Sequence, residues 1–542
     1  MSAVKTRIVP TLYDDKGRPY CKSIMSRTEN TVRAKCTIPP DHVIPVIFVP
    51  GIMGSNLKST AKENIEGLAW APDSFTWARK FMFYKPAKRQ ILLNPSLASI
   101  DDSSEIPNAE VSWFSDMGAD VQANWKAEFK RRGWGTVMLS SYGPLLYHLE
   151  YHLNRMYQNG KVAEPWQALM KDQGKGWGEL KGFAALIEKE LLDASDHWFP
   201  VHAVGYNWLE SNDQAGKYLA GKIEQFIAHY RKQGYPCDKA ILVTHSMGGL
   251  VARAACHPKI GNAASKVLGV VHGVQPATGA ATAYKRVHAG FEAGLGKDTL
   301  VAKVLGWTGA DVTAVFANAP GALQLLPNKL YPAGWLKVSR TGTGTKAQDI
   351  LSLPKADPYQ EIYREKDKWW RLIQPEWIDP SGKLVNESKD PWERYLDNLD
   401  KAEQFHDTLG DYYHPSSWVH YGADEDHRAW GHVRWYPIGE IRYVRDGEIE
   451  NARLKADNSL GRLVLESSEI RHNTLTPWWN QEMESPHSSG DGTVPEESGR
   501  APQGKVKFIA KMRGFDHQGS YQYAQVQALT LYCIAKIAGG SA

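Results

Sequence analysis

The stretch ILVTHSMGGLVAR, residues 241–253, decides the fold of this 542-residue chain. A strand of β-branched and aliphatic residues runs directly into His-Ser-Met-Gly-Gly, and a helix of small residues follows. This pattern predicts a nucleophile elbow, a sharp strand-to-helix turn that exposes the hydroxyl of Ser246. Gly248 and Gly249 supply the small residues that the turn needs downstream, whereas Thr244 stands where glycine is usual. The alternative is a serine that only caps an ordinary helix.

The composition of the chain argues against several classes of protein. The chain has 64 basic and 60 acidic residues, a net charge of +4, which argues against a nucleic-acid partner. No apolar run is long enough to span a bilayer. The first residues carry no apolar signal-peptide core, so we expect synthesis in the cytoplasm without a signal peptide. The 20 tryptophans fit either a large core or, more weakly, a lipid surface.

Strands alternate with helices around the predicted elbow. Buried strands are expected at residues 43–49, 201–204, 241–244, 267–271 and 505–510. Such alternation predicts an α/β fold with a mostly parallel sheet and helices on both faces. This alternation of strands and helices is lost from about residue 276 to residue 480, which predicts a large inserted cap or lid.

The expected organisation has six parts. These are an N-terminal leader at 1–40, a core strand with a glycine-rich loop at 41–60, a first insertion at 61–195, a core with the elbow at 196–275, a cap or lid insertion at 276–480, and a closing core segment at 481–542. Within the cap, residues 284–317 have a helical pattern and form our expected lid, with a static cap as the alternative.

A serine nucleophile needs a histidine base and a carboxylate that orients the imidazole. Asp491, in the tight turn GDGTVP at 490–495, is the expected acid, and His517, between the last strand and the last helix, is the expected base. Asp516 is the alternative acid, and His487 is the main alternative base. Three further histidines are weaker alternatives because they fall within the cap: His414, His420 and His427.

Two backbone amides must stabilise the oxyanion that forms during attack on an ester. One is expected from Met247, the residue after the nucleophile. The other is expected from Ile52 in the loop PGIMG at 50–54, which follows an early buried strand. The alternative is a glycine-rich turn that only reverses the chain.

Several of these motifs together resemble a known family. VIFVPGIMGS at 46–55, THSMGG at 244–249, GDGTVP at 490–495 and His517 look like the α/β-hydrolase lipases, in particular the lecithin:cholesterol acyltransferase-like and GPI-inositol deacylase-like branches. GYNW at 205–208 and PGALQLLP at 320–327 are also similar to motifs of those proteins. The acyltransferase pattern Tyr-Asp-Trp-Arg is replaced by Tyr-Asn-Trp-Leu here, which separates this chain from that family's substrate contacts.

The long tryptophan-rich insertions resemble a narrower group, the lipase effectors that bacteria deliver by type VI secretion. The resemblance implies an antibacterial toxin that acts on phospholipid membranes of a target cell. It also implies secretion into the target-cell periplasm and a cognate immunity protein that covers the active site. The sequence leaves the oligomeric state open.

The predicted function is a serine lipase of the phospholipase A type, with Ser246, His517 and Asp491 as the triad. The alternatives are a lipid acyltransferase, another ester hydrolase, or a catalytically silent binding module. We expect no cofactor and assign no metal ligand. The acidic run Asp424-Glu425-Asp426 is more typical of a solvated loop than of a calcium site.

Overall fold

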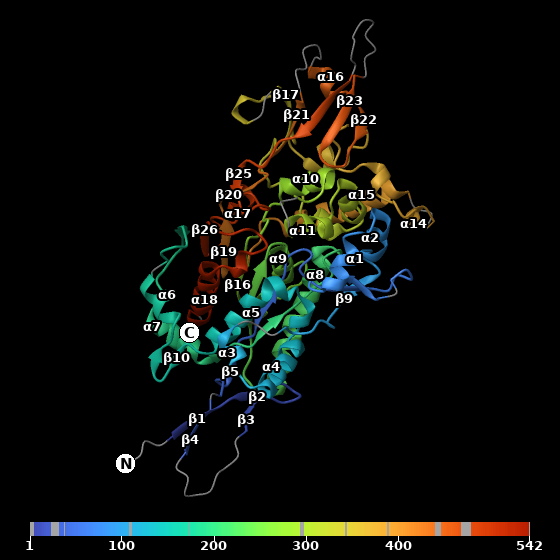
Figure 1. Ribbon diagram of the computed structural model, residues 1–542. Coiled ribbons are helices and arrows are strands. Elements are labelled where there is room, and N and C mark those ends of the chain that lie inside the picture. The colour runs from blue at the N-terminus through green and yellow to red at the C-terminus, as the bar shows by residue number, and fades with distance from the viewer. Residues whose placement is uncertain are drawn as a thin grey trace.

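The computed structural model describes residues 5–22, 32–36, 38–64, 66–107, 111–172, 174–292, 297–341, 344–386, 390–438, 446–467 and 478–540. The molecule is elongated, with short N-terminal strands at one end and a second sheet at the other (Figure 1). The largest sheet lies between these ends (Figure 1). Among the described residues, no helix is both long and apolar enough to cross a membrane.

Seven strands form the central sheet, in the order β12-β26-β19-β16-β15-β6-β14. Every neighbouring pair is parallel except the edge pair β12–β26. The strands are β6 (Val46–Val49), β12 (Glu179–Lys181), β14 (Val201–Ala203), β15 (Ala240–His245), β16 (Val267–Gly273), β19 (Ser417–Gly422) and β26 (Phe508–Met512). All residues of β6, β14 and β15 are buried, as expected for a parallel sheet covered by helices.

Small residues bring the covering helices close to the sheet and to one another. Helices α8 (Asn212–Lys232) and α9 (Gly248–Cys256) pack together where a Cβ on Gly216 would meet Ala254 at 2.6 Å. Helix α18 (Ala524–Gly539) packs on β16, where a Cβ on Gly269 would meet Ile537. The α/β-hydrolase architecture predicted from the elbow is thus the architecture of the molecule.

Two strands of the central sheet come from ranges that we expected to be insertions. β19 lies inside 276–480, and β12 lies inside 61–195. β19 is buried between β16 and β26, so the chain returns to the core within the predicted cap. β12 is a short antiparallel edge strand with two exposed residues. Its sequence therefore has almost no hydrophobic pattern from which a strand could be predicted.

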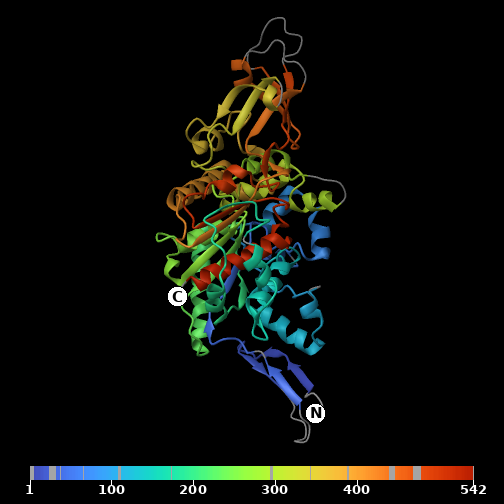
Figure 2. The ribbon, with the colours of Figure 1, turned by 90° about the vertical axis from the view of Figure 1, so that its left-hand side faces the viewer.

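Above the central sheet lies a second sheet of six strands (Figure 2). Its order is β18-β17-β21-β24-β23-β22, and every pair except β17–β21 is antiparallel. The strands are β17 (Leu336–Thr341), β18 (Gln348–Leu353), β21 (Val433–Ile438), β22 (Arg453–Asp457), β23 (Arg462–Glu466) and β24 (Trp478–Met483). We call this sheet, residues 336–353, 433–438, 453–466 and 478–483, the cap sheet.

Helices lie between the cap sheet and the central sheet (Figure 1). They are α10 (Ala281–Ala289), α11 (Lys297–Leu305), α12 (Gly309–Phe316), α13 (Pro320–Leu323), α14 (Lys383–Asn386) and α15 (Pro391–Leu409). Another helix, α16 (Asp446–Glu450), lies at the far end of the cap sheet (Figure 1). The predicted lid range 284–317 therefore covers α10 to α12, apart from residues 293–296, which lie outside the described residues. Gly321 of α13 abuts the carbonyl oxygens of Trp208 and Glu210, so the two motifs that carry part of the family resemblance pack on each other.

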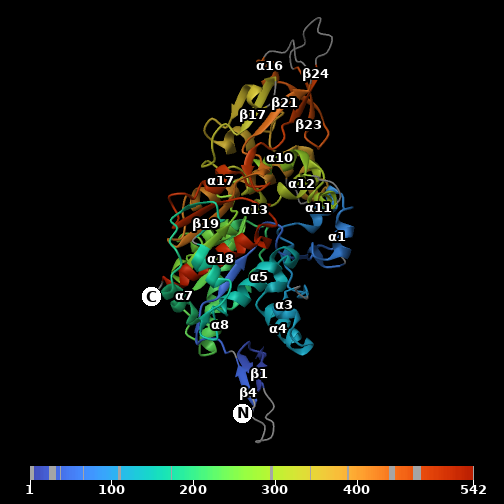
Figure 3. The ribbon, with the colours of Figure 1, turned by 60° about the vertical axis from the view of Figure 1, so that its left-hand side comes forward.

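The first insertion contributes short strands and helices on the side of the core. They are β8 (Leu68–Trp70), α1 (Phe75–Phe81), α2 (Pro86–Leu92), β9 (Ala98–Ile100), α3 (Ser112–Ser115), α4 (Ala119–Arg131), α5 (Leu139–Leu153), β10 (Tyr157–Gln158), β11 (Lys161–Val162), α6 (Trp166–Asp172) and α7 (Glu188–Ser195). β7 (Leu57–Ser59), which lies just before the insertion, pairs with β8 and β9. Figure 3 shows α1 beside α11 and α12. Arg89 of α2 donates to the carbonyls of Val304 and Lys303, so the first insertion is bound to the expected lid.

The remaining short elements lie at the N-terminus and beside the core. They are β1 (Lys5–Val9), β2 (Thr11–Tyr13), β3 (Pro19–Cys21), β4 (Val32–Cys36), β5 (His42–Val43), β13 (His197–Trp198), β20 (Asp424–Ala429), β25 (Ser488–Gly490) and α17 (Glu496–Arg500). Most of the described tryptophans are buried, among them Trp134, Trp208 and Trp435. Their abundance therefore reflects the core.

Candidate active site

Ser246 lies on a tight turn between β15 and α9, with φ at +52°. This left-handed conformation is strained for a residue with a side chain. The turn is closed by glycines: a Cβ on Gly248 would meet the carbonyl oxygens of Val49 and Pro50 at 2.4 and 2.5 Å, and one on Gly51 would meet the Cβ of Ser246 at 2.9 Å. The elbow predicted from residues 241–253 thus has the expected shape and touches the glycine-rich loop.

The structure brings Ser246, His517 and Asp491 into one hydrogen-bonded chain. The Nε2 of His517 lies 2.9 Å from the Oγ of Ser246. The Nδ1 of the same ring lies 2.8 Å from the Oδ2 of Asp491. A serine hydroxyl bonded to an imidazole that a carboxylate orients is an arrangement that can deprotonate the serine for attack on a carbonyl.

Asp491 is held by the turn that contains it. Its Oδ1 accepts hydrogen bonds from the backbone amides of Thr493 (3.1 Å) and Val494 (2.7 Å). Its own carbonyl accepts a bond from the amide of His517 at 2.8 Å, which joins the two loops. The Asp491 side chain is only 1% exposed, so its Oδ2 faces His517 rather than water.

The two expected oxyanion donors lie in the loops that meet at Ser246. Within the described part of the chain, the amides of Ile52 and Met247 donate to no protein acceptor. Two side chains fix the loop that carries Ile52 by donating to its carbonyl oxygens. Tyr206 donates from its hydroxyl to the carbonyl of Pro50 at 3.0 Å, and the Trp70 indole donates to the carbonyl of Met53 at 2.7 Å. Both amides are therefore available to a ligand in a rigid setting.

His245 and Tyr142 support the site, and the sequence analysis did not single them out. The Nδ1 of His245 lies 3.1 Å from the Tyr142 hydroxyl, and its Nε2 lies 2.9 Å from the carbonyl oxygen of His517. Burial, with a smaller contribution from His517, lowers the pKa of His245 to about 3. A neutral His245 therefore connects α5 to the histidine loop. The position of His245 next to Ser246 was the available signal, but nothing in the sequence marks Tyr142.

The alternative acid and bases lie elsewhere or have other partners. Asp516 accepts a hydrogen bond from the amide of Gly519 at 2.9 Å and so closes its own turn. His487 lies against His432, with ring centroids 3.6 Å apart and the planes tilted by 38°. His427 contacts Asp424, which also accepts a bond from the amide of Gly514 at 2.7 Å.

The last two alternatives are also accounted for. His420 is buried in β19, and burial lowers its pKa to about 4. The Nδ1 of His414 accepts from the amide of Ser416. The described contacts of these histidines therefore do not include Ser246.

Comparison with known proteins places the chain in a family. No family model matches the sequence, and no curated protein matches it. A chain in the crystal structure of the Tle4–Tli4 complex is similar over 91% of this chain and 98% of its own length, with 30% identity and a TM-score of 0.75. At this identity and coverage, the chain belongs to the Tle4 family of type VI secretion lipase effectors, which have the α/β-hydrolase fold.

Proposed function

We propose that this protein is a serine-dependent phospholipase A that acts on the glycerophospholipids of a target bacterium. The hydrogen-bonded chain from Ser246 through His517 to Asp491 carries the proposal. Membership in a family of lipase effectors supports the ester as the bond that is cleaved.

The proposed reaction has two steps. His517 takes the proton of Ser246 as its Oγ attacks the ester carbonyl, and Asp491 stabilises the imidazolium that forms. The amides of Ile52 and Met247 hold the oxyanion, and each such donor is worth about 3 kcal/mol of the barrier. His517 then protonates the leaving alcohol, the lysophospholipid. Water, activated by the same histidine, releases the fatty acid from Ser246.

We further propose that the protein is delivered by type VI secretion into the target-cell periplasm, and that a cognate immunity protein covers its active site. The similarity to a chain of the Tle4–Tli4 complex supports both parts. Finding the protein secreted by a strain that lacks the secretion apparatus would contradict the delivery.

The decisive test is mass spectrometry of vesicles made from mixed bacterial phospholipids, treated with the wild type or with Ser246→Ala. We expect lysophospholipid and free fatty acid from the wild type alone, and labelling of Ser246 by a serine-reactive phosphonate. Labelling without phospholipid products would point to another ester or to acyl transfer. Neither labelling nor products would point to a silent binding module.

A further inference from the structure

Two segments that connect the core to the cap sheet lie side by side. Residues 430–432 lead from β20 to β21, and residues 484–487 lead from β24 back to β25. β20 and β25 pair with each other, as do β21 and β24, so the two segments cross between the same pairs of strands. Asp491 follows directly after β25. The geometry of this crossing is therefore linked to the acid of the proposed triad.

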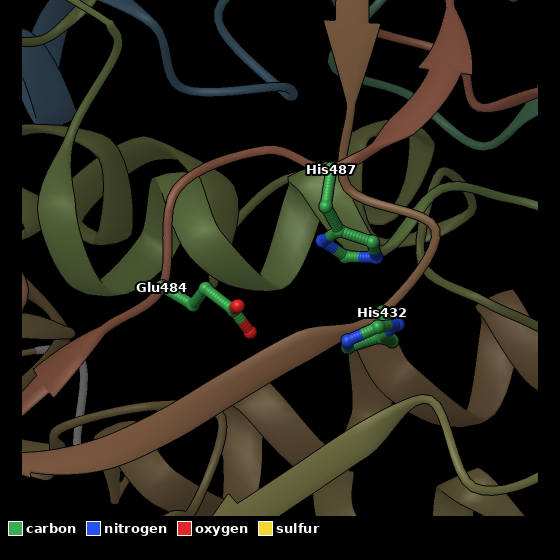
Figure 4. Close-up of side chains that lie close together, drawn as sticks. All are labelled: His432, Glu484 and His487. Atoms are coloured by element: carbon green, nitrogen blue, oxygen red, sulfur yellow. The ribbon is translucent and has the colours of Figure 1, made fainter. Parts of the chain in front are cut away.

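Three metal-binding side chains meet at this crossing. His432 comes from the first segment, and Glu484 and His487 come from the second, with one ligand atom from each residue within 4.8 Å of the others. Figure 4 shows the two imidazoles facing each other and the Glu484 carboxylate directed toward them. The ring centroids of His432 and His487 are 3.6 Å apart, with an angle of 38° between the ring planes.

Both imidazoles have nitrogens available for a ligand. The Nε2 atoms of His432 and His487 are buried and make no hydrogen bond within the part of the chain that the structure describes. A buried nitrogen without a partner loses its hydration without compensation, so such groups usually have a bound water or ion. Metal ions bind imidazole through a deprotonated ring nitrogen, so these atoms are suited to ligation.

The charges around the cluster nearly balance. Arg434 donates from Nη1 to Glu484 at 2.5 Å and from Nε to Asp349 at 2.9 Å. Lys337 lies 3.9 Å from the same Asp349 carboxylate. Two cations therefore face two carboxylates, and Arg434 orients Glu484 as an outer partner of a metal ligand would.

We propose that His432, Glu484 and His487 bind one divalent transition-metal ion, best matched by Zn²⁺, which fastens the cap sheet to the core beside Asp491. Two imidazoles and one carboxylate are typical zinc ligands and leave a fourth position for water. Ca²⁺ and Mg²⁺ prefer oxygen ligands throughout, so the two histidines argue against them. This inference does not rest on the proposed hydrolysis.

The test uses the full-length protein after removal of metals with a chelator, titrated with Zn²⁺ by competition calorimetry. We expect one zinc ion per chain, and a loss of affinity of more than ~100-fold in His487→Ala and in His432→Ala. His197→Ala is the matched control, because His197 also lies near a second histidine, His42, with ring centroids 6.0 Å apart. Its zinc affinity should equal that of the wild type, as should that of Ser246→Ala.

Cobalt(II) gives a second measurement on the unmodified chain, which stays decisive if a variant fails to fold. Bound in place of zinc, it should show the strong visible absorption of a four-coordinate ion, and X-ray absorption should report two imidazole ligands. Zinc binding that is not stoichiometric, or that is unchanged in His487→Ala, would overturn the proposal. A six-coordinate cobalt spectrum without imidazole ligands would also overturn it.

Discussion

Around Ser246 the glycines pack too closely to admit another carbon atom, whereas around Asp491 the chain is held by hydrogen bonds to one carboxylate. On the serine side, Gly51 and Gly248 leave no room for a single added carbon atom. On the acid side, both oxygens of Asp491 are occupied, one by two backbone amides and the other by His517.

This difference implies that substitutions on the two sides of the site have different effects. An added methyl group on the serine side must displace backbone, so it should change both stability and rate. An isosteric change on the acid side preserves the shape and alters only which groups donate and accept.

Replacing Ser246 should have the largest effect. We expect Ser246→Ala to lower kcat by about 10⁶-fold, because the attacking oxygen is removed. Ser246→Gly should be equally inactive yet more stable than Ser246→Ala by about 1 kcal/mol, since glycine adopts a φ of +52° without strain. Phospholipid hydrolysis rates and urea denaturation measure the two effects. Equal stability of the two variants would show that the turn is not strained.

Asp491→Asn should have the next largest effect, about 10⁴-fold in kcat. The amide keeps the shape of the carboxylate, but its NH₂ group cannot hold His517 in the tautomer that accepts the serine proton. Initial rates on the same vesicles measure the loss, and the melting temperature should change little. Asp516→Asn is the control, since among the described residues Asp516 bonds its own turn at Gly519 and not His517, and its rate should stay near that of the wild type. A large loss in the control would favour Asp516 as the acid.

The elbow and the order of Ser246, Asp491 and His517 could be predicted from sequence because each lies in a short motif with its own steric or hydrogen-bonding demand. The loop at 50–54 could be predicted as well, from its glycine pattern directly after an early buried strand. The structure places all of these residues around one point. A local sequence pattern is sufficient to predict a feature that one short segment forms by itself.

Features made by distant segments could not be predicted in this way. β19 lies within a region rich in charged and aromatic residues, and its place in the central sheet depends on pairing with β16 and β26. His432 and His487 are 55 residues apart in the sequence, a spacing that matches no metal-binding motif. Tyr142 contacts His245 across 103 residues. Only the fold shows these contacts.

Gly248→Ala tests the packing on the serine side. Its Cβ would lie 2.4 Å from the carbonyl oxygen of Val49, so the backbone must move. We expect a loss of about 1–3 kcal/mol in the free energy of unfolding. The rate should fall by about 10²–10³-fold as the oxyanion amides separate. Gly221→Ala is the matched control, because no described atom outside the neighbouring backbone of α8 lies within 4 Å of its Cβ, and it should be slightly stabilising. A fully active Gly248→Ala would show that the turn can adapt.

Tyr142→Phe should have the smallest effect. It tests most directly whether the serine side of the site depends on packing more than on hydrogen bonds. It removes the hydroxyl that lies 3.1 Å from the Nδ1 of His245 and that accepts from the Gly51 amide at 3.4 Å, so both buried groups lose this partner, at a cost of about 1–3 kcal/mol in stability. Because backbone packing still holds Ser246, kcat should fall by less than about ten-fold, or 1.4 kcal/mol. Tyr147→Phe on the same helix is the control, since within the described part of the chain its hydroxyl donates to the carbonyl of Pro107, at 3.2 Å, and to no group of the site. If Tyr142→Phe instead reduced kcat as much as Asp491→Asn, hydrogen bonds would position both sides of the site, and the contrast between them would be wrong.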